Sequence, residues 1–389
     1  MDYYKKALEL HEKYKGKIDI KCDMPLNNRE DLAVAYTPGV AQPCLEIAKD
    51  PENAYKYTSK GHLVAIVTDG SAVLGLGNIG GMAGMPVMEG KAALFKRFGG
   101  VDGFPICLST QNTEEIIAAV RAIAPTFGGI NLEDISAPRC FEIEERLERE
   151  LDIPVFHDDQ HGTAIVVTAA LINALKIVGK EMKDIKVALS GPGAAGTAII
   201  KMLQYCGVKN IVACDSRGII FRGREGLDAH KTLLAQTTNP ENTSGSLADA
   251  VRGADVFVGV SAPGILTAEM VKTMAEKPVI FAMANPVPEI GYEEALAAGA
   301  AVVGTGRSDF PNQVDDVRAF PGIFRGALDC GAREINYDMK TAAAAAIAEL
   351  VLPEQLSPEY IIPDPFDPRV AENVARRVAE AAVATGAVR

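Results

Sequence analysis

Two series of short apolar runs, each alternating with helical patterns, fill most of the chain and constrain its fold more than any other feature. The runs of the first series lie at 62–68, 101–109, 128–132 and 154–156. Helical patterns at 90–98 and 113–123 separate them. Short apolar runs between helices are typical of parallel strands buried on both faces, because the connecting helices cover the sheet. The sequence therefore predicts an α/β protein.

The second series follows a long apolar helix expected at about 162–178. Its runs lie at 185–190, 210–214, 254–260, 278–284 and 300–304. This strand–helix–strand spacing indicates a doubly wound, Rossmann-type domain. Two further helices are expected at about 338–351 and 368–384, joined by the proline-rich IIPDPFDP. We expect an N-terminal α/β domain over 1–160, a Rossmann-type domain over 161–330, and C-terminal helices over 331–389 that return to the first domain.

Composition narrows the class of partner. Lysine and arginine number 39 against 51 acidic residues, a net charge of −12, whereas nucleic acids and anionic membranes bind concentrated basic surfaces. The opening MDYYKKALELHEKYKGK lacks the apolar stretch of a signal peptide. The apolar stretch at 164–178 is interrupted by Asn173 and Lys176, which leaves it short of a ~20-residue membrane span. With seven scattered cysteines and no CxxC pair, we expect a cytoplasmic protein with free thiols.

A glycine-rich loop follows the first strand of the second series. The loop GPGAAG at 191–196 has the G-x-G-x-x-G arrangement, and a helix follows it. Its glycines allow a tight turn and a close approach to a pyrophosphate, which the start of the helix would bind. Asp215 ends the next strand, where an acid that binds the ribose is expected. The pattern favours dinucleotide binding over a plain structural turn. Asp215 favours NAD, but Arg217 can offset its repulsion of a 2′-phosphate, so NADP stays open.

Acidic residues follow two strands of the first series, in INLEDI at 130–135 and FHDDQH at 156–161. Ligands collect at the carboxyl ends of parallel strands, so Glu133, Asp134 and Asp159 can converge there and hold Mg²⁺ or Mn²⁺. Two other interpretations stay open. The acids can simply cap the helices that follow, or His157 and His161 can join Asp159 in a zinc or iron site.

Lys91 is placed near the start of a helix, after the glycine-rich GLGNIGGMAGMPVMEG. Such glycines bring the backbone close to a ligand and leave the lysine in a cleft. A positive helix end and a metal would lower the pKa of Lys91, as a general base requires. The alternative is a solvated surface charge. Tyr36, in AYTPGV, is by itself a routine turn residue.

Taken together, these motifs resemble those of the malic enzymes in their short bacterial and archaeal form. The matching stretches are AYTPGVA (35–41), VTDGSAVLGLGNIG (67–80), MPVMEGKAALFK (85–96), INLEDI (130–135), FHDDQHGTA (156–164), GPGAAG (191–196), FAMANP (281–286) and GRSDFPNQV (306–314). They occur in family order and cover most of the chain. The resemblance implies oxidative decarboxylation of malate to pyruvate and CO₂ with reduction of NAD(P), and it suggests a homodimer.

The resemblance also implies roles for particular residues. Tyr36 corresponds to the general acid and Lys91 to the general base, with Asp158 beside the lysine. Glu133, Asp134 and Asp159 would be the ligands of the metal ion, which would be Mn²⁺ or Mg²⁺. The cofactor would contact Gly191, Gly193, Ala194, Ala195, Gly196 and Asp215, and Asn285 would line the nicotinamide side.

Two departures from the family pattern bear on the substrate. Larger family members carry an arginine for the substrate carboxylate where this chain has Ala72, as short forms generally do, and we expect Arg307 to serve instead. The pair Asp315-Asp316 stands where asparagines are usual, and acids facing a dicarboxylate would repel it. Other decarboxylating dehydrogenases of 2-hydroxy acids therefore stay open, as do a metallohydrolase built on His157, Asp159 and His161 and a non-catalytic dinucleotide sensor.

Overall fold

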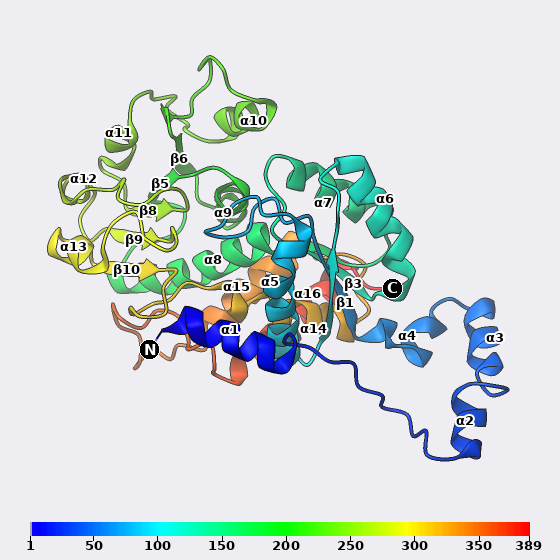
Figure 1. The fold of residues 1–389 in the computed structure, drawn as a ribbon. Helices are drawn as coiled ribbons and strands as arrows, with labels where there is room; N and C mark the ends of the chain where they lie inside the picture. The colour runs from blue at the N-terminus through cyan, green and yellow to red at the C-terminus, as the bar shows by residue number, and fades with distance from the viewer. Residues whose placement is uncertain (1) are drawn as a thin grey trace.

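The structure is a computed structural model that describes residues 2–389, and it contains two separate sheets joined by a long helix (Figure 1). The first sheet has the order β2-β1-β3-β4, with all strands parallel. Its strands are β1 (Leu63–Thr68), β2 (Asp102–Cys107), β3 (Gly129–Leu132) and β4 (Val155–His157). Every residue of β3 and β4 is buried, as expected of strands covered on both faces.

Helices cover both faces of this sheet. They are α5 (Gly81–Leu94), the short π-helix η2 (Phe95–Gly99), α6 (Thr113–Ile123), η3 (Ala124–Thr126) and α7 (Arg139–Glu150). On one face Ile117 of α6 and Ile143 of α7 share a buried apolar cluster with Val67 of β1. Phe95 of η2 and Ile66 of β1 belong to another buried cluster, to which α5 also contributes.

The second sheet has the order β10-β9-β8-β5-β6-β7, and its strand order reverses at β5 as in a doubly wound fold. Its parallel strands are β5 (Lys186–Ser190), β6 (Asn210–Asp215), β8 (Val256–Gly259), β9 (Val279–Ala282) and β10 (Val302–Thr305). A two-residue antiparallel edge strand, β7 (Gly218–Ile219), was not expected from the sequence. The flanking helices are α9 (Ala194–Tyr205), α10 (Ala229–Thr237), α11 (Leu247–Val251), α12 (Ala268–Lys272) and α13 (Tyr292–Ala297). These two sheets confirm the predicted α/β class.

Helix α8 (Asp158–Val178) begins directly after β4 and connects the first sheet to the second (Figure 1). Within residues 2–389 it is the one helix long and apolar enough to cross a membrane, with a mean hydropathy of 1.6. However, 78% of that stretch is buried inside the protein, where α8 packs against α9 and α15. It is therefore a core helix, and it ends at Gly179, whose φ of 71° suits glycine.

The C-terminal helices return to the first sheet, as the sequence predicts. They are α14 (Phe320–Asp329), α15 (Tyr337–Ala348) and α16 (Arg369–Thr385), preceded by the short η4 (Asp316–Arg318). On α14, Phe320 and Phe324 pack edge-on against Phe95, with ring centroids 4.7 and 5.3 Å apart. The division of the chain at residues 160 and 330 stays a prediction.

The N-terminal segment is less buried than the rest of the chain. It contains α1 (Tyr3–Tyr14), α2 (Arg29–Ala35), α3 (Ala41–Lys49), α4 (Asn53–Tyr57) and η1 (Ser59–Gly61). Lys17, just after α1, bonds to Pro86 and Glu89 of α5. Residues 20–50, which we call the N-terminal arm, include no buried residue and extend away from both sheets in Figure 1.

Candidate active site

A cleft of about 990 Å³ lies between the carboxyl ends of the two sheets. From the first sheet and its helices it is lined by Lys91, Glu133, Asp134 and Asp159. From the second it is lined by Ala194, Ala195, Ser261, Asn285, Asp315 and Asp316. The structure thus brings residues from most of the predicted motifs to one place, as expected of carboxyl strand ends.

Lys91 lies in the last turns of α5, which begins at Gly81, so the prediction that it starts a helix is wrong. The helix can begin earlier because glycine lets it approach β2 closely. A Cβ on Gly81 would lie 2.3 Å from the carbonyl oxygen of Leu108. This approach directs the buried Lys91 side chain into the cleft, over the ring of Phe320.

Three carboxylates surround the Lys91 amine. Its Nζ is 2.5 Å from Asp158 Oδ2, 3.0 Å from Glu133 Oε1 and 3.8 Å from Asp316 Oδ2. Burial alone lowers the pKa of Lys91, but these three negative charges outweigh it and hold the pKa well above its usual value. The lowered pKa, which the sequence predicts for Lys91 beside a bound metal, stays a prediction.

The acidic cluster forms because β3 and β4 are neighbours in register. Leu132 pairs with His157, so the residues that follow each strand, Glu133-Asp134 and Asp158-Asp159, leave the sheet side by side. Carboxylate oxygens of Glu133, Asp134 and Asp159 lie within 4.8 Å of one another. Asp134 has a left-handed φ of 54°, a conformation that is rare for residues other than glycine and that collects at functional sites.

The chemistry of this cluster fits a hard divalent cation. Burial, together with the neighbouring carboxylates, raises the pKa of Asp134 to about 8, and burial raises that of Asp159 to about 6. Asp134 Oδ2 is buried and has no hydrogen-bond partner. A cation with oxygen ligands, such as Mn²⁺ or Mg²⁺, would neutralise these charges and satisfy that atom. Glu133, Asp134 and Asp159 would hold it.

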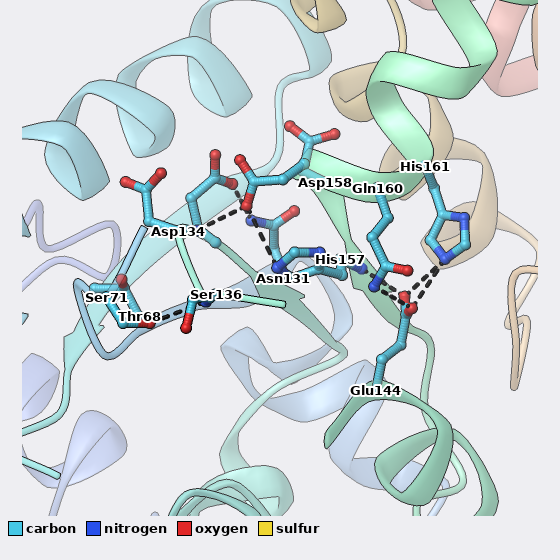
Figure 2. A network of polar contacts seen from close by, with 12 residues as sticks. Thr68, Ser71, Asn131, Asp134, Ser136, Glu144, His157, Asp158, Gln160 and His161 are labelled. Carbon is cyan, nitrogen blue, oxygen red and sulfur yellow. Dashed lines mark hydrogen bonds and ion pairs between the residues drawn. The ribbon is translucent and has the colours of Figure 1, made fainter. Parts of the chain in front are cut away.

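The two histidines do not join this cluster. Among residues 2–389, the group of side chains that could hold a metal contains only the three carboxylates. His161 points away from them and bonds Glu144, as Figure 2 shows. His157 is fully buried, its Nε2 lies 3.3 Å from Asp159 Oδ2, and burial lowers its pKa. His157 therefore contacts one of the three carboxylates, but it lies outside the group of side chains that converge as possible ligands.

Two buried glutamates that the sequence reading missed support the cleft from behind. Glu144, on α7, accepts three hydrogen bonds from the last residue of β4 and the first turn of α8 (Figure 2). Glu289 accepts the backbone N–H groups of Ser261 and Ala284, and so holds together the loops that follow β8 and β9. A usable signal existed for Glu144, because it lies on the apolar face of α7 with Cys140, Ile143 and Leu147.

The glycine-rich loop has the expected form. It turns between β5 and α9 with Gly191 at φ 95°, and a Cβ on Gly196 would lie 2.1 Å from the carbonyl oxygen of Gly191. A second hollow of about 880 Å³ runs along this loop past Asp215. Val260 and Ser261 line both hollows, so the two adjoin each other beside the glycine-rich loop.

Asp215 lines this hollow and is held by cationic neighbours, and its contact with a ribose stays a prediction. Both its oxygens accept from Arg224, at 2.6 and 2.7 Å, and Oδ2 also accepts from Lys231 at 2.8 Å. Burial raises the pKa of Asp215, but the bonds from Lys231 and Arg224 outweigh it and bring the pKa to about 2. Lys231 and Arg217 also line the hollow, which is therefore cationic around this acid.

Two predicted residues lie apart from the cleft. Tyr36, on the N-terminal arm, is 67% exposed and does not line the cleft. Arg307 donates two hydrogen bonds to Asp309 and one to the carbonyl oxygen of Pro286, so its charge is already paired. The structure therefore does not support Arg307 as the partner of a substrate carboxylate.

Comparison with known proteins agrees with this geometry. A family model described as malic enzyme, N-terminal domain, matches residues 15–148, and one described as malic enzyme, NAD binding domain, matches residues 160–383. The bifunctional malic/malolactic enzyme of Bacillus subtilis is 58% identical, over 100% of this chain and 95% of its own length. The NAD-dependent malic enzyme of Geobacillus stearothermophilus is 60% identical, over 96% and 78%. The crystal structure of malic enzyme from Pyrococcus horikoshii is 52% identical and matches with a TM-score of 0.95, covering 99% of this chain and 92% of that one.

Proposed function

The chain belongs to the malic enzyme family, and we infer that the cleft between its two sheets is where it converts (S)-malate to pyruvate and CO₂ while reducing NAD(P). One observation carries this assignment. A buried lysine and a cluster of three cation-binding carboxylates lie in a cleft that continues into the glycine-rich loop. A metallohydrolase would leave that loop unused.

A dinucleotide cofactor and a divalent ion would supply part of the chemistry. A bound nicotinamide accepts a hydride, and a bound divalent ion polarises a carbonyl and stabilises negative charge on oxygen. Glu133, Asp134 and Asp159 would hold the ion, and the loop at 191–196 with Asn285 would hold the dinucleotide. The rest of the chemistry belongs to the side chains of this protein.

We assign the proton at the C2 hydroxyl of malate to Lys91. A base must be neutral, whereas the charges of Asp158, Asp316 and Glu133 outweigh burial and raise the pKa of Lys91. When Glu133 serves as a cation ligand, it no longer stabilises the charged lysine to the same extent. Asp158, 2.5 Å from the amine, orients Lys91 and can receive its proton.

Tyr36 would return a proton to C3 after CO₂ leaves. Its own chain holds it outside the cleft, so we propose that each cleft receives Tyr36 of the partner subunit in a homodimer. Apolar side chains are exposed both on the N-terminal arm and at the rim of the cleft. Those on the arm include Ile20, Leu26, Leu32 and Val34, and those lining the cleft include Leu74, Val87 and Leu94. Exposed apolar patches of this kind favour association.

We propose that the enzyme accepts NADP as well as NAD. An acid at the end of β6 would repel a 2′-phosphate, but Arg224 and Lys231 neutralise Asp215. The cationic surroundings of Asp215 can bind the extra phosphate. We also propose that the enzyme is located in the cytoplasm.

An assay of malate oxidation tests the function. Purified protein is given (S)-malate, Mn²⁺ and either NAD or NADP, and reduced nicotinamide and pyruvate are measured together. We expect equal amounts of both products with either cofactor, and loss of turnover when EDTA removes the ion. NADH binding without turnover would instead support the non-catalytic sensor, and a different 2-hydroxy acid as the better substrate would redefine the specificity.

A further inference from the structure

We infer that Glu144 is a positioning residue, which orients the metal-binding turn of the cleft from behind. The inference rests on the proposed function, because it concerns how the proposed ligand Asp159 is held. Glu144 itself does not line the cleft.

The contacts of Glu144 all lead to one segment. Its Oε1 accepts the backbone N–H of His157 at 2.7 Å, and its Oε2 accepts from Gln160 Nε2 at 2.9 Å and His161 Nε2 at 3.0 Å. These donors flank Asp158 and Asp159 in sequence. Figure 2 shows Glu144 on one side of the turn and the side chain of Asp158 directed to the other.

The start of α8 needs such a partner. His157 is the N-cap of α8, but its side chain makes no capping hydrogen bond. In a capping box, an acid or amide at the third helical position accepts the N–H of the N-cap residue. Here Gln160 holds that position and its side chain donates to Glu144 instead. Glu144, from a different helix, accepts the N-cap N–H in its place.

A carboxylate is required at this position because all three partners are donors. A carboxylate only accepts, whereas the amide of glutamine would turn an NH₂ group toward at least one donor. Glu144 is 5% exposed, so an unsatisfied group there cannot turn to water. The buried Lys340 of α15 compensates its charge electrostatically.

The hydrogen bonds of Glu144 therefore fix the orientation of the turn that carries Asp158 and Asp159. Asp158 and Asp159 are the first two residues of α8, so a tilt of this turn would move both carboxylates. The carboxylate of Asp158 would move away from Lys91, and that of Asp159 would move away from Glu133 and Asp134. Groups that orient metal ligands in this way typically change metal affinity by about 10- to 100-fold when they are removed.

The test is Mn²⁺ binding to Glu144→Gln, measured by electron paramagnetic resonance of the free ion without substrate. We expect the Kd for Mn²⁺ to rise at least about tenfold. The Kd for NADH, measured by fluorescence, should stay unchanged because Glu144 does not touch the dinucleotide site. Glu145→Gln, the same change on an exposed residue of the same helix, should bind both ligands like the wild type.

The outcomes separate this inference from the proposed function. Equal Mn²⁺ affinity in Glu144→Gln and wild type overturns the positioning role alone. Failure of the wild type to bind Mn²⁺ overturns the proposed site and this inference with it. If Glu144→Gln does not fold by circular dichroism, Gln160→Met removes one of the three donors. A wild-type Kd for Mn²⁺ in that variant overturns the inference, and a rise of about threefold supports it.

Discussion

Asp316 shows how a single residue changes the chemistry of this cleft. Its carboxylate is 3.8 Å from the Lys91 amine, and burial raises the pKa of Asp316. Burial, followed by the charge of Asp316, holds the pKa of Asp158 well above its usual value. Malate carries two negative charges, so an additional acid here opposes its binding.

We therefore predict that Asp315→Asn combined with Asp316→Asn lowers KM for malate by about tenfold. The sign follows from removing negative charge that faces an anion, and tenfold corresponds to about 1.4 kcal/mol. Initial rates at saturating Mn²⁺ and cofactor measure it. The single variants locate the effect, which we expect in Asp316→Asn because Asp315 instead caps η4 through the N–H of Val317. An unchanged or higher KM in the double variant would place these acids outside substrate binding.

At this scale the sequence identified which residues gather but not their charge states. The motifs that contain Lys91 and the three proposed ligands are local, and each could be recognised alone. The pKa of Lys91 depends on Asp158, Glu133 and Asp316, which come from separate segments. The ion pairs of Asp215 could not be predicted for the same reason, since its partners Arg224 and Lys231 lie beyond the strand that carries it.

The strands were predictable because their burial is written in uninterrupted apolar runs, as β5 and β9 show. The start of α5 could not be predicted in this way. Pro86 and several glycines give residues 81–90 poor helix propensity, and tertiary packing overrides it where Gly81 meets Leu108. The two-residue strand β7 was also missed, because a strand this short has no periodicity to detect.

The elements around the end of β6 lead to a prediction on the cofactor. Lys231 of α10 bonds Asp215 and lines the hollow beside it. Lys231→Gln should raise KM for NADP by about tenfold and change KM for NAD by less than about twofold, because only the 2′-phosphate needs the positive charge. Lys209→Gln, an exposed lysine just before β6, is the matched control. Equal changes with the two cofactors would show that Lys231 acts on the fold of the hollow rather than on the phosphate.

In the whole molecule, the N-terminal arm is the part that a single chain leaves incomplete. The arm buries none of its own residues, yet it carries exposed leucine, isoleucine and valine side chains and the proposed acid Tyr36. The sequence could not predict the position of the arm, because the surface that would bury it belongs to another molecule in the proposed dimer.

Paired variants decide whether the sites are shared between subunits. Lys91→Ala and Tyr36→Phe should each lose at least about 10²-fold in kcat as homodimers, because each removes one acid or base group. A purified heterodimer of these two chains should recover about half of the wild-type kcat per dimer if arms are exchanged, since one cleft then combines an intact Lys91 with an intact Tyr36. If each cleft uses its own arm, that heterodimer contains no intact site and stays inactive. The heterodimer of wild type with the double variant gives the opposite pattern, inactive with exchanged arms and half-active without exchange. Activity in the first heterodimer and none in the second would establish both the dimer and the role of Tyr36, because no arrangement within one chain produces that pair of results.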